Sequence, residues 1–157
     1  MQQITLNTGK VIVTDPCYEP VNGCNLLLKN VLPGNWNCTA RKKNCGTWGS
    51  RITSLTIRHE DYPKGRIEEY EGFAAVDSGQ CGFFEPDYYE ENYKDDDYNN
   101  LESWYRRVCE RTASEPYWGV FEGMGVVSES GYGDGCYDIY SLRNDSGYIV
   151  SLRLKFI

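Results

Sequence analysis

The chain has 157 residues and a formal net charge of −7, from 16 Lys and Arg against 23 Asp and Glu. This length suits one domain spanning 1–157, because a chain of this size buries about two thirds of its unfolded surface in one core. The negative charge argues against binding duplex nucleic acid or an anionic membrane surface. No apolar run approaches a membrane span and the N-terminus does not resemble a signal peptide, so we expect a cytoplasmic location.

The chain also contains seven cysteines. An odd number without a signal peptide favours free thiols over a disulfide framework. Cys17 and Cys24 enclose six residues, as do Cys38 and Cys45, whereas zinc sites usually have roughly two to four residues between paired cysteines. We therefore expect most of the thiols to pack as small core residues.

Strands dominate the pattern along the chain. β-Branched and aromatic runs bounded by turn residues predict strands at 11–13, 26–32, 35–41, 51–59, 72–76, 117–128, 137–143 and 148–157. In the last of these, apolar residues occupy every second position from Tyr148 to Phe156, which indicates one buried and one solvated face. Asn144-Asp145-Ser146-Gly147 separates the last two runs and predicts a hairpin.

One amphipathic helix is predicted near 99–111. Its apolar positions follow the helical spacing i, i+3, i+4, i+7 and i+8, at Leu101, Trp104, Tyr105, Val108 and Cys109. Asn99 or Asn100 would cap its N-terminus. The fold class that follows is mainly β (α+β): an antiparallel β-sandwich or half-open barrel with one covering helix.

Two glycine-rich segments, 76–84 and 130–137, are candidates for a functional site. Their sequences are Val-Asp-Ser-Gly-Gln-Cys-Gly-Phe-Phe and Ser-Gly-Tyr-Gly-Asp-Gly-Cys-Tyr. One interpretation is two simple turns, with Asp134-Gly135 as a hairpin turn. The other is a ligand site, because glycines at this density allow another backbone or a ligand to approach closely. A third segment, Asp15-Pro16-Cys17-Tyr18, also places a carboxylate at the end of a predicted strand, where a simple turn is again the alternative.

If these loops meet in space, they line one recess. The side chains that would then contact a ligand are Asp15, Tyr18, Asp77, Ser78, Gln80, Phe83, Phe84, Ser130, Tyr132, Asp134 and Tyr137. No recognisable catalytic set accompanies them: His59 is the single histidine, which excludes a histidine-rich metal centre and the H-E-x-x-H motif, and the phosphate-binding P-loop motif is absent. We therefore expect a non-catalytic site without a cofactor. The alternative is a hydrolase whose divalent cation is held by Asp77 and Asp134, with Asp15 as third ligand.

An acidic segment at 85–97 contains seven carboxylates interleaved with tyrosines. Its simplest interpretation is a solvated loop ahead of the helix, whose N-terminus favours negative charge. A second interpretation is an acidic decoy that binds a basic partner.

The two glycine-rich motifs resemble an uncharacterised domain family of bacteria and phages, whose sequences carry Val-Asp-Ser-Gly-Gln-x-Gly-Phe-Phe and Ser-Gly-Tyr-Gly-Asp-Gly-x-Tyr. The start at Thr14–Tyr18 and the closing strand from Gly147 fit the same pattern, so the likeness spans most of the chain. The resemblance implies a small cytosolic protein of a phage or other mobile element, and no activity comes with it. The leading hypothesis is a binding protein that captures a small polar ligand or a host protein, with a counter-defence role by analogy.

Overall fold

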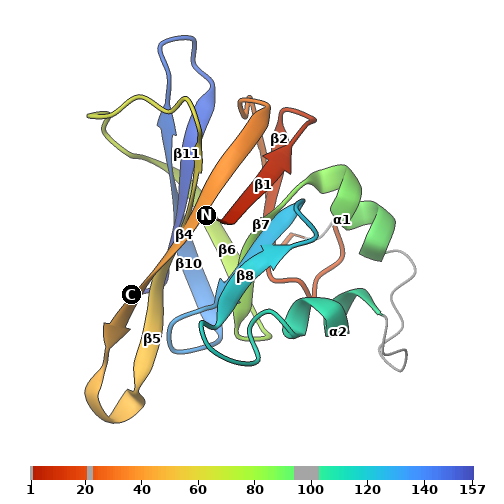
Figure 1. Ribbon diagram of the computed structural model, residues 1–157, viewed down its shortest axis with the longest axis vertical. Helices are drawn as coiled ribbons and strands as arrows, with labels where there is room; N and C mark the ends of the chain where they lie inside the picture. Colours follow the sequence, from red (N-terminus) through yellow and green to blue (C-terminus); the bar gives the residue numbers. More distant parts are fainter. Residues whose placement is uncertain (1, 21–22, 94–102) are drawn as a thin grey trace.

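The fold consists of two antiparallel sheets packed face to face (Figure 1). The computed structural model describes residues 2–20, 23–93 and 103–157. The first sheet has six strands, in the order β1 (Gln2–Leu6), β4 (Gly34–Asn44), β5 (Ser50–His59), β11 (Ile149–Lys155), β10 (Gly135–Arg143) and β6 (Glu69–Val76). The second has five, in the order β3 (Leu26–Lys29), β2 (Lys10–Thr14), β7 (Gln80–Phe84), β9 (Gly125–Glu129) and β8 (Trp118–Phe121). The predicted mainly β sandwich is confirmed.

The edges of the two sheets approach each other on both sides of the sandwich. The Thr5 amide donates to the Gly123 carbonyl at 2.8 Å, and the Ala75 amide donates to the Cys24 carbonyl at 3.0 Å. These contacts are single hydrogen bonds and not ladders, so the sandwich does not close into a barrel. They still cover edge strands that would otherwise present unpaired backbone groups.

The main core lies between the sheets. Strands with alternating apolar residues direct one face inward, so Trp36, Ile57 and Leu152 of the first sheet meet Phe83 and Val126 of the second. The outer face of the second sheet is also apolar and carries a smaller core. The strand β7 is accordingly buried along its whole length, and its alternate residues serve the two cores in turn.

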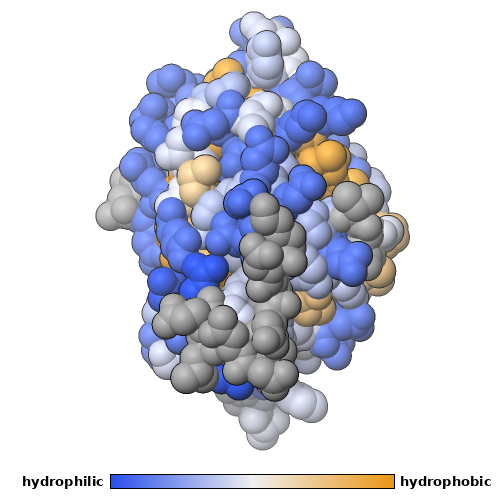
Figure 2. Space-filling view, turned by 90° about the vertical axis from the view of Figure 1, so that its right-hand side faces the viewer, coloured by the Kyte–Doolittle hydropathy of each residue, from blue (hydrophilic) through white to orange (hydrophobic). Residues whose placement is uncertain are grey.

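Two helices cover that outer face. They are α1 (Pro86–Tyr93) and α2 (Trp104–Cys109), which are joined through residues that the structure does not describe. Phe84 projects from β7 into an aromatic cluster, with its ring centroid 5.2 Å from that of Tyr89 and 5.5 Å from that of Trp104. Edge-to-face packing of this kind adds to the area that the rings bury. The solvent side of this face is mainly hydrophilic (Figure 2).

In the described residues, the helix predicted near 99–111 spans Trp104–Cys109, which is shorter than the predicted range. It begins at Trp104, because the Ser103 hydroxyl accepts a hydrogen bond from the Arg106 amide and caps the first turn. Asn99 and Asn100, the predicted caps, lie outside the described residues. The helix α1 was not predicted, since its residues were interpreted as an acidic loop. Within the described part of the chain, no helix is both long and apolar enough to cross a membrane.

Both glycine-rich motifs are corners at which the chain passes from one sheet to the other. Residues 77–79 join β6 of the first sheet to β7 of the second, and residues 130–134 join β9 of the second to β10 of the first. The interpretation of Asp134-Gly135 as a hairpin turn is wrong, because β10 pairs with β6 and β11 and not with β9. The register pairs Val76 with Gly135 and Gln80 with Glu129, so the two corners must lie side by side.

Two glycines allow β7 and β9 to approach closely. A Cβ atom at Gly82 would lie 2.1 Å from the Val126 carbonyl oxygen, and one at Gly125 would lie 2.3 Å from the Phe84 ring. We expect Gly82→Ala to lower the free energy of unfolding by about 1–3 kcal/mol, because backbone atoms must shift to admit the methyl group. Urea unfolding followed by circular dichroism measures this change. Gly23→Ala is the control, since no atom lies within 4 Å of its Cβ position; an equal loss in both variants would contradict the steric explanation.

Candidate functional site

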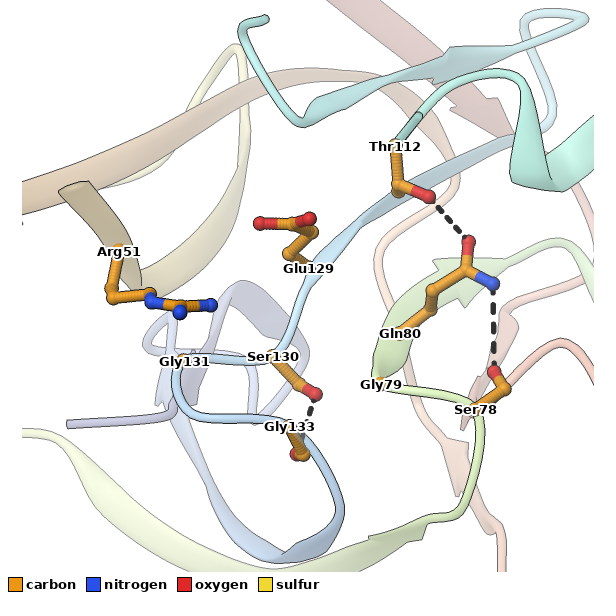
Figure 3. A pocket seen from close by; sticks show the side chains of 9 residues that line it. All are labelled: Arg51, Ser78, Gly79, Gln80, Thr112, Glu129, Ser130, Gly131 and Gly133. Carbon is orange, nitrogen blue, oxygen red and sulfur yellow. Dashed lines mark hydrogen bonds between the residues drawn. The ribbon is translucent and has the colours of Figure 1, made fainter. Parts of the chain in front are cut away.

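A polar cavity of about 280 Å³ lies at the end of the sandwich, between the two corners (Figure 3). The β6–β7 corner supplies one wall and the β9–β10 corner another, while the start of β5 and the segment after α2 complete it. The lining consists of Arg51, Ser78, Gly79, Gln80, Thr112, Glu129, Ser130, Gly131 and Gly133. Every one of these residues is polar or glycine, so the cavity suits a hydrogen-bonding ligand better than an apolar one.

The β6–β7 corner is held by the buried carboxylate of Asp15, at the end of β2. One oxygen, Oδ2, accepts the amides of Asp77 at 2.8 Å and Ser78 at 2.6 Å. The other, Oδ1, accepts the Cys17 amide at 2.9 Å and the Ser78 hydroxyl at 2.6 Å. A fully buried carboxylate is costly unless donors replace its water, and four donors do so here. Asp15 therefore positions the corner and does not face the cavity.

The β9–β10 corner is braced by its own hydrogen bonds and by a link to the first corner. The Ser130 amide donates to the Gly79 carbonyl at 3.0 Å, which joins the two corners directly. The Ser130 hydroxyl donates to the Gly133 carbonyl at 2.8 Å, and the Tyr137 hydroxyl donates to the same carbonyl at 2.6 Å. Gly79 and Gly131 have φ angles of 70° and 58°, which glycine adopts without the strain that a side chain would add.

A chain of side-chain hydrogen bonds forms the wall next to α2. The Thr112 hydroxyl donates to Gln80 Oε1 at 2.7 Å, and Gln80 Nε2 lies 3.3 Å from the Cys109 sulfur. The same nitrogen lies 3.5 Å from the Ser78 hydroxyl oxygen. The Gln80 amide is thus oriented by Thr112, and both hydrogens of its Nε2 are directed at protein acceptors.

Two opposite charges line the cavity near each other. Figure 3 shows the Arg51 guanidinium and the Glu129 carboxylate pointing toward each other beside Ser130 and Gly131. Burial raises the pKa of the Glu129 carboxyl above its ordinary value, and Arg51 and Lys42 oppose this rise while Glu115 adds to it. The cavity therefore offers one fixed cation and one carboxyl group whose charge is disfavoured.

The predicted ligand-binding residues separate into several groups. Ser78, Gln80 and Ser130 line the cavity. Asp15 and Tyr137 support the corners through hydrogen bonds to their backbone. The remaining six lie elsewhere, as described next.

Phe83 and Phe84 are fully buried, one in each core, so we assign them to packing and not to ligand contact. The Asp77 carboxylate accepts a hydrogen bond from the Tyr18 hydroxyl. Tyr132 is exposed, with its ring against Trp48, and Asp134 is also exposed and does not line the cavity.

The three aspartates of the metal alternative do not come together. Among the residues that the structure describes, no three His, Cys, Asp or Glu side chains are grouped closely enough to hold a metal ion. Both oxygens of Asp15 already accept protein donors. Burial, with Asp15 nearby, raises the pKa of the Cys17 thiol to about 12, so this cysteine stays protonated and is a poor nucleophile.

The acidic segment 85–97 is not a uniform solvated surface. Glu85 is buried and accepts the Asn7 amide at 2.8 Å and the Thr8 hydroxyl at 2.5 Å. Residues 86–93 form α1, and the remaining acidic residues of the segment lie outside the described residues. Glu85 therefore has a structural role and does not belong to an exposed decoy.

Three lining residues lie outside the two glycine-rich motifs and were not predicted as site residues: Arg51, Thr112 and Glu129. Glu129 directly precedes the second glycine-rich motif, and this adjacency was the available signal for it. Nothing local marks Thr112, which reaches the cavity only because α2 packs on the second sheet.

No protein-family model, curated protein or solved structure matches this chain. The resemblance to a bacterial and phage domain family therefore gains no support from these comparisons and stays a prediction. The functional proposal below depends on the geometry of the cavity.

Asp15→Asn tests the role of the buried carboxylate. We expect a loss of about 2–3 kcal/mol in the free energy of unfolding. The substitution replaces one of the two oxygens that accept the four donors by an NH2 group, which cannot accept a hydrogen bond. Chemical denaturation measures it. Asp134→Asn, at the exposed aspartate, should change stability by less than about 0.5 kcal/mol; equal effects of the two substitutions would contradict this assignment.

Glu129→Gln tests the raised pKa. The folded protein binds this proton more tightly than the unfolded chain, so stability from this group is greatest at low pH and falls as pH rises through the raised pKa. Relative to wild type, Glu129→Gln should therefore be more stable near about pH 7 than near about pH 3. Denaturation curves at both pH values measure the difference. Glu60→Gln reports the effect of removing one surface charge, and a pH-independent difference for Glu129→Gln would contradict the assignment.

Proposed function

We propose that this protein is a non-catalytic binding protein that holds a small polar ligand in the cavity between its two sheet corners. The observation that carries the proposal is that two motifs about 50 residues apart in the chain lie side by side. The hydrogen bond from the Ser130 amide to the Gly79 carbonyl joins them. This junction forms the cavity in advance of any ligand. A preformed site spares a ligand the cost of ordering loops when it binds.

The lining indicates the chemistry of the ligand. The Arg51 guanidinium suits a carboxylate or another oxyanion, which it can bind through two parallel hydrogen bonds. Glu129 and the Gln80–Thr112 pair suit hydroxyl, amide or ammonium groups of the ligand. At about 280 Å³ the cavity lies near the lower end of ordinary ligand sites. A compact metabolite, such as an amino acid or a hydroxy acid, fits these requirements.

The hydroxyl groups of the cavity support binding better than catalysis. The Ser78 hydroxyl donates to the Asp15 carboxylate and the Ser130 hydroxyl donates to a backbone carbonyl. Neither is paired with a histidine or lysine that would accept its proton as a general base. His59 lies against Trp36, with its ring nitrogens bonded to the Pro33 carbonyl and the Asp61 amide.

The alternative form of the binding hypothesis is that the protein captures a host protein. The helix-covered face in Figure 2 is mainly hydrophilic, and no broad apolar area is visible among its described residues. Stable protein interfaces usually have an apolar centre, so this face favours the small-ligand reading. In a phage or mobile-element protein, as the motifs imply, removal of a host signal metabolite would be the corresponding role.

Native mass spectrometry tests the proposal. Wild-type protein is incubated with the low-molecular-mass fraction of a bacterial extract, desalted and measured, and any adduct is identified after denaturation. We expect an adduct of defined mass that Arg51→Ala loses, because the anionic group of the ligand would have no cation. Arg58→Ala is the matched control on the same strand, where the guanidinium lies 5.1 Å from the Tyr62 ring.

Adduct retention by both variants, or no adduct on the wild type, would contradict the proposal. Circular dichroism of each variant confirms that the fold is unchanged before the comparison is made.

A further inference from the structure

The positive charge of this acidic protein is concentrated in one part of the chain. Residues 20–59 contain six of the 16 Lys and Arg residues and none of the 23 Asp and Glu residues. The rest of the chain therefore has a net charge of −13 against +6 for this part. An asymmetry of this size between parts of one chain indicates a surface that meets an anionic partner.

Four of these six cations lie on a two-stranded arm formed by the ends of β4 and β5, residues 39–53. The last β1–β4 pair is Gln2 with Cys38, and the last β11–β5 pair is Lys155 with Ser54. Beyond these pairs, the two strands of the arm pair only with each other among the described strands, and the Thr53 carbonyl at the base of the arm also accepts the Phe156 and Ile157 amides at 2.9 and 3.1 Å. Figure 1 shows the arm extending past the body of the sandwich.

Two cations on the arm lie opposite each other, and their repulsion disfavours the folded state. Lys43 lies directly opposite Arg51 in the β4–β5 register, and like charges at such positions repel each other. Lys42 is paired with Glu115, but among the described residues no salt bridge is found for Arg41 or Lys43. An anion bound between these side chains would relieve the repulsion.

Two large aromatic side chains are exposed beside these cations. Trp48, at the tip of the arm, is 65% exposed, and Tyr132, on the β9–β10 corner, is 57% exposed. Their ring centroids lie 6.0 Å apart with the planes at 71°. Exposed aromatic rings next to cations are the combination that binds single strands, since bases stack on the rings while cations hold the phosphates.

We propose that this arm binds single-stranded nucleic acid, with phosphate groups at Arg41 and Lys43 and bases stacked on Trp48 and Tyr132. A duplex does not offer unstacked bases to these rings, in agreement with the expectation from net charge. An acidic peptide would use the cations but would leave both rings exposed to water. This inference concerns a surface separate from most of the cavity; only Arg51 belongs to both.

Fluorescence anisotropy with a labelled oligothymidylate of about 15 nucleotides tests the proposal at about 50 mM salt. We expect Trp48→Ala to weaken binding at least about fivefold, because one stacked base is lost. Trp48→Phe should retain most of the affinity, since it keeps an aromatic face. Lys43→Ala should reduce the slope of log affinity against log salt by about 0.7, the value for one phosphate of a single strand.

Lys10→Ala is the matched control, because Lys10 and Lys29 form another like-charged pair in the β2–β3 register. It removes the same charge without touching the arm, and it should leave affinity nearly unchanged. Unaltered circular dichroism spectra establish that each variant is folded.

Three results would overturn the proposal: no binding by the wild type, equal affinity for Trp48→Ala and wild type, or competition by polyglutamate as strong as by unlabelled oligothymidylate. The last result would identify the arm as a surface for acidic proteins. Arg51 is left unchanged throughout, so failure here is independent of failure at the cavity.

Discussion

The buried carboxylate of Asp15 is the interaction on which the geometry of the candidate site depends. Its burial is tolerable because the backbone and side chain of Ser78, with the amides of Cys17 and Asp77, replace the water that folding removes. These same donors begin the corner where the chain leaves the first sheet. Once the corner is fixed, the Gly79 carbonyl is placed to accept the Ser130 amide, and the second corner is fixed in turn.

The two binding surfaces proposed here occupy the same end of the sandwich but differ in construction. The walls of the cavity are two hydrogen-bonded corners and the Gln80–Thr112 pair. The arm is a two-stranded ribbon, and none of the described strands pairs with its tip; such ribbons gain little stability of their own. Arg51 lies where the arm meets the cavity, so a bound anion at either surface would change the field at the other.

The sequence predicted the fold class well because the strand signals are local. The period-two pattern at 148–157 and the turn at 144–147 correspond to the β10–β11 hairpin. Other features lacked a clear local signal. The expected strand at 117–128 is two strands, joined at Glu122 and Gly123, which both have positive φ; glutamate is an unusual residue for such a turn. The helix α1 is rich in Asp, Glu and Tyr and gave no apolar stripe.

The site was located from its glycines, but its chemistry was only partly predictable. Both motifs were recognised, and their meeting follows from the pairing of Val76 with Gly135, which no local pattern reveals. Asp77 and Asp134 were expected to share the recess, yet the cavity takes its carboxyl group from Glu129. Arg51 and Thr112 reach it from other elements, so their role depends on tertiary packing.

Residue-resolved amide hydrogen exchange, measured by NMR, tests most directly whether the two corners are locked together. The amides of Asp77, Ser78 and Ser130 should exchange as slowly as those of the central strands, because the first two donate to the buried Asp15 carboxylate and the third donates to the Gly79 carbonyl. Exchange of these three amides as fast as that of the exposed Lys64 would show that the corners open freely. The cavity between them would then not be preformed.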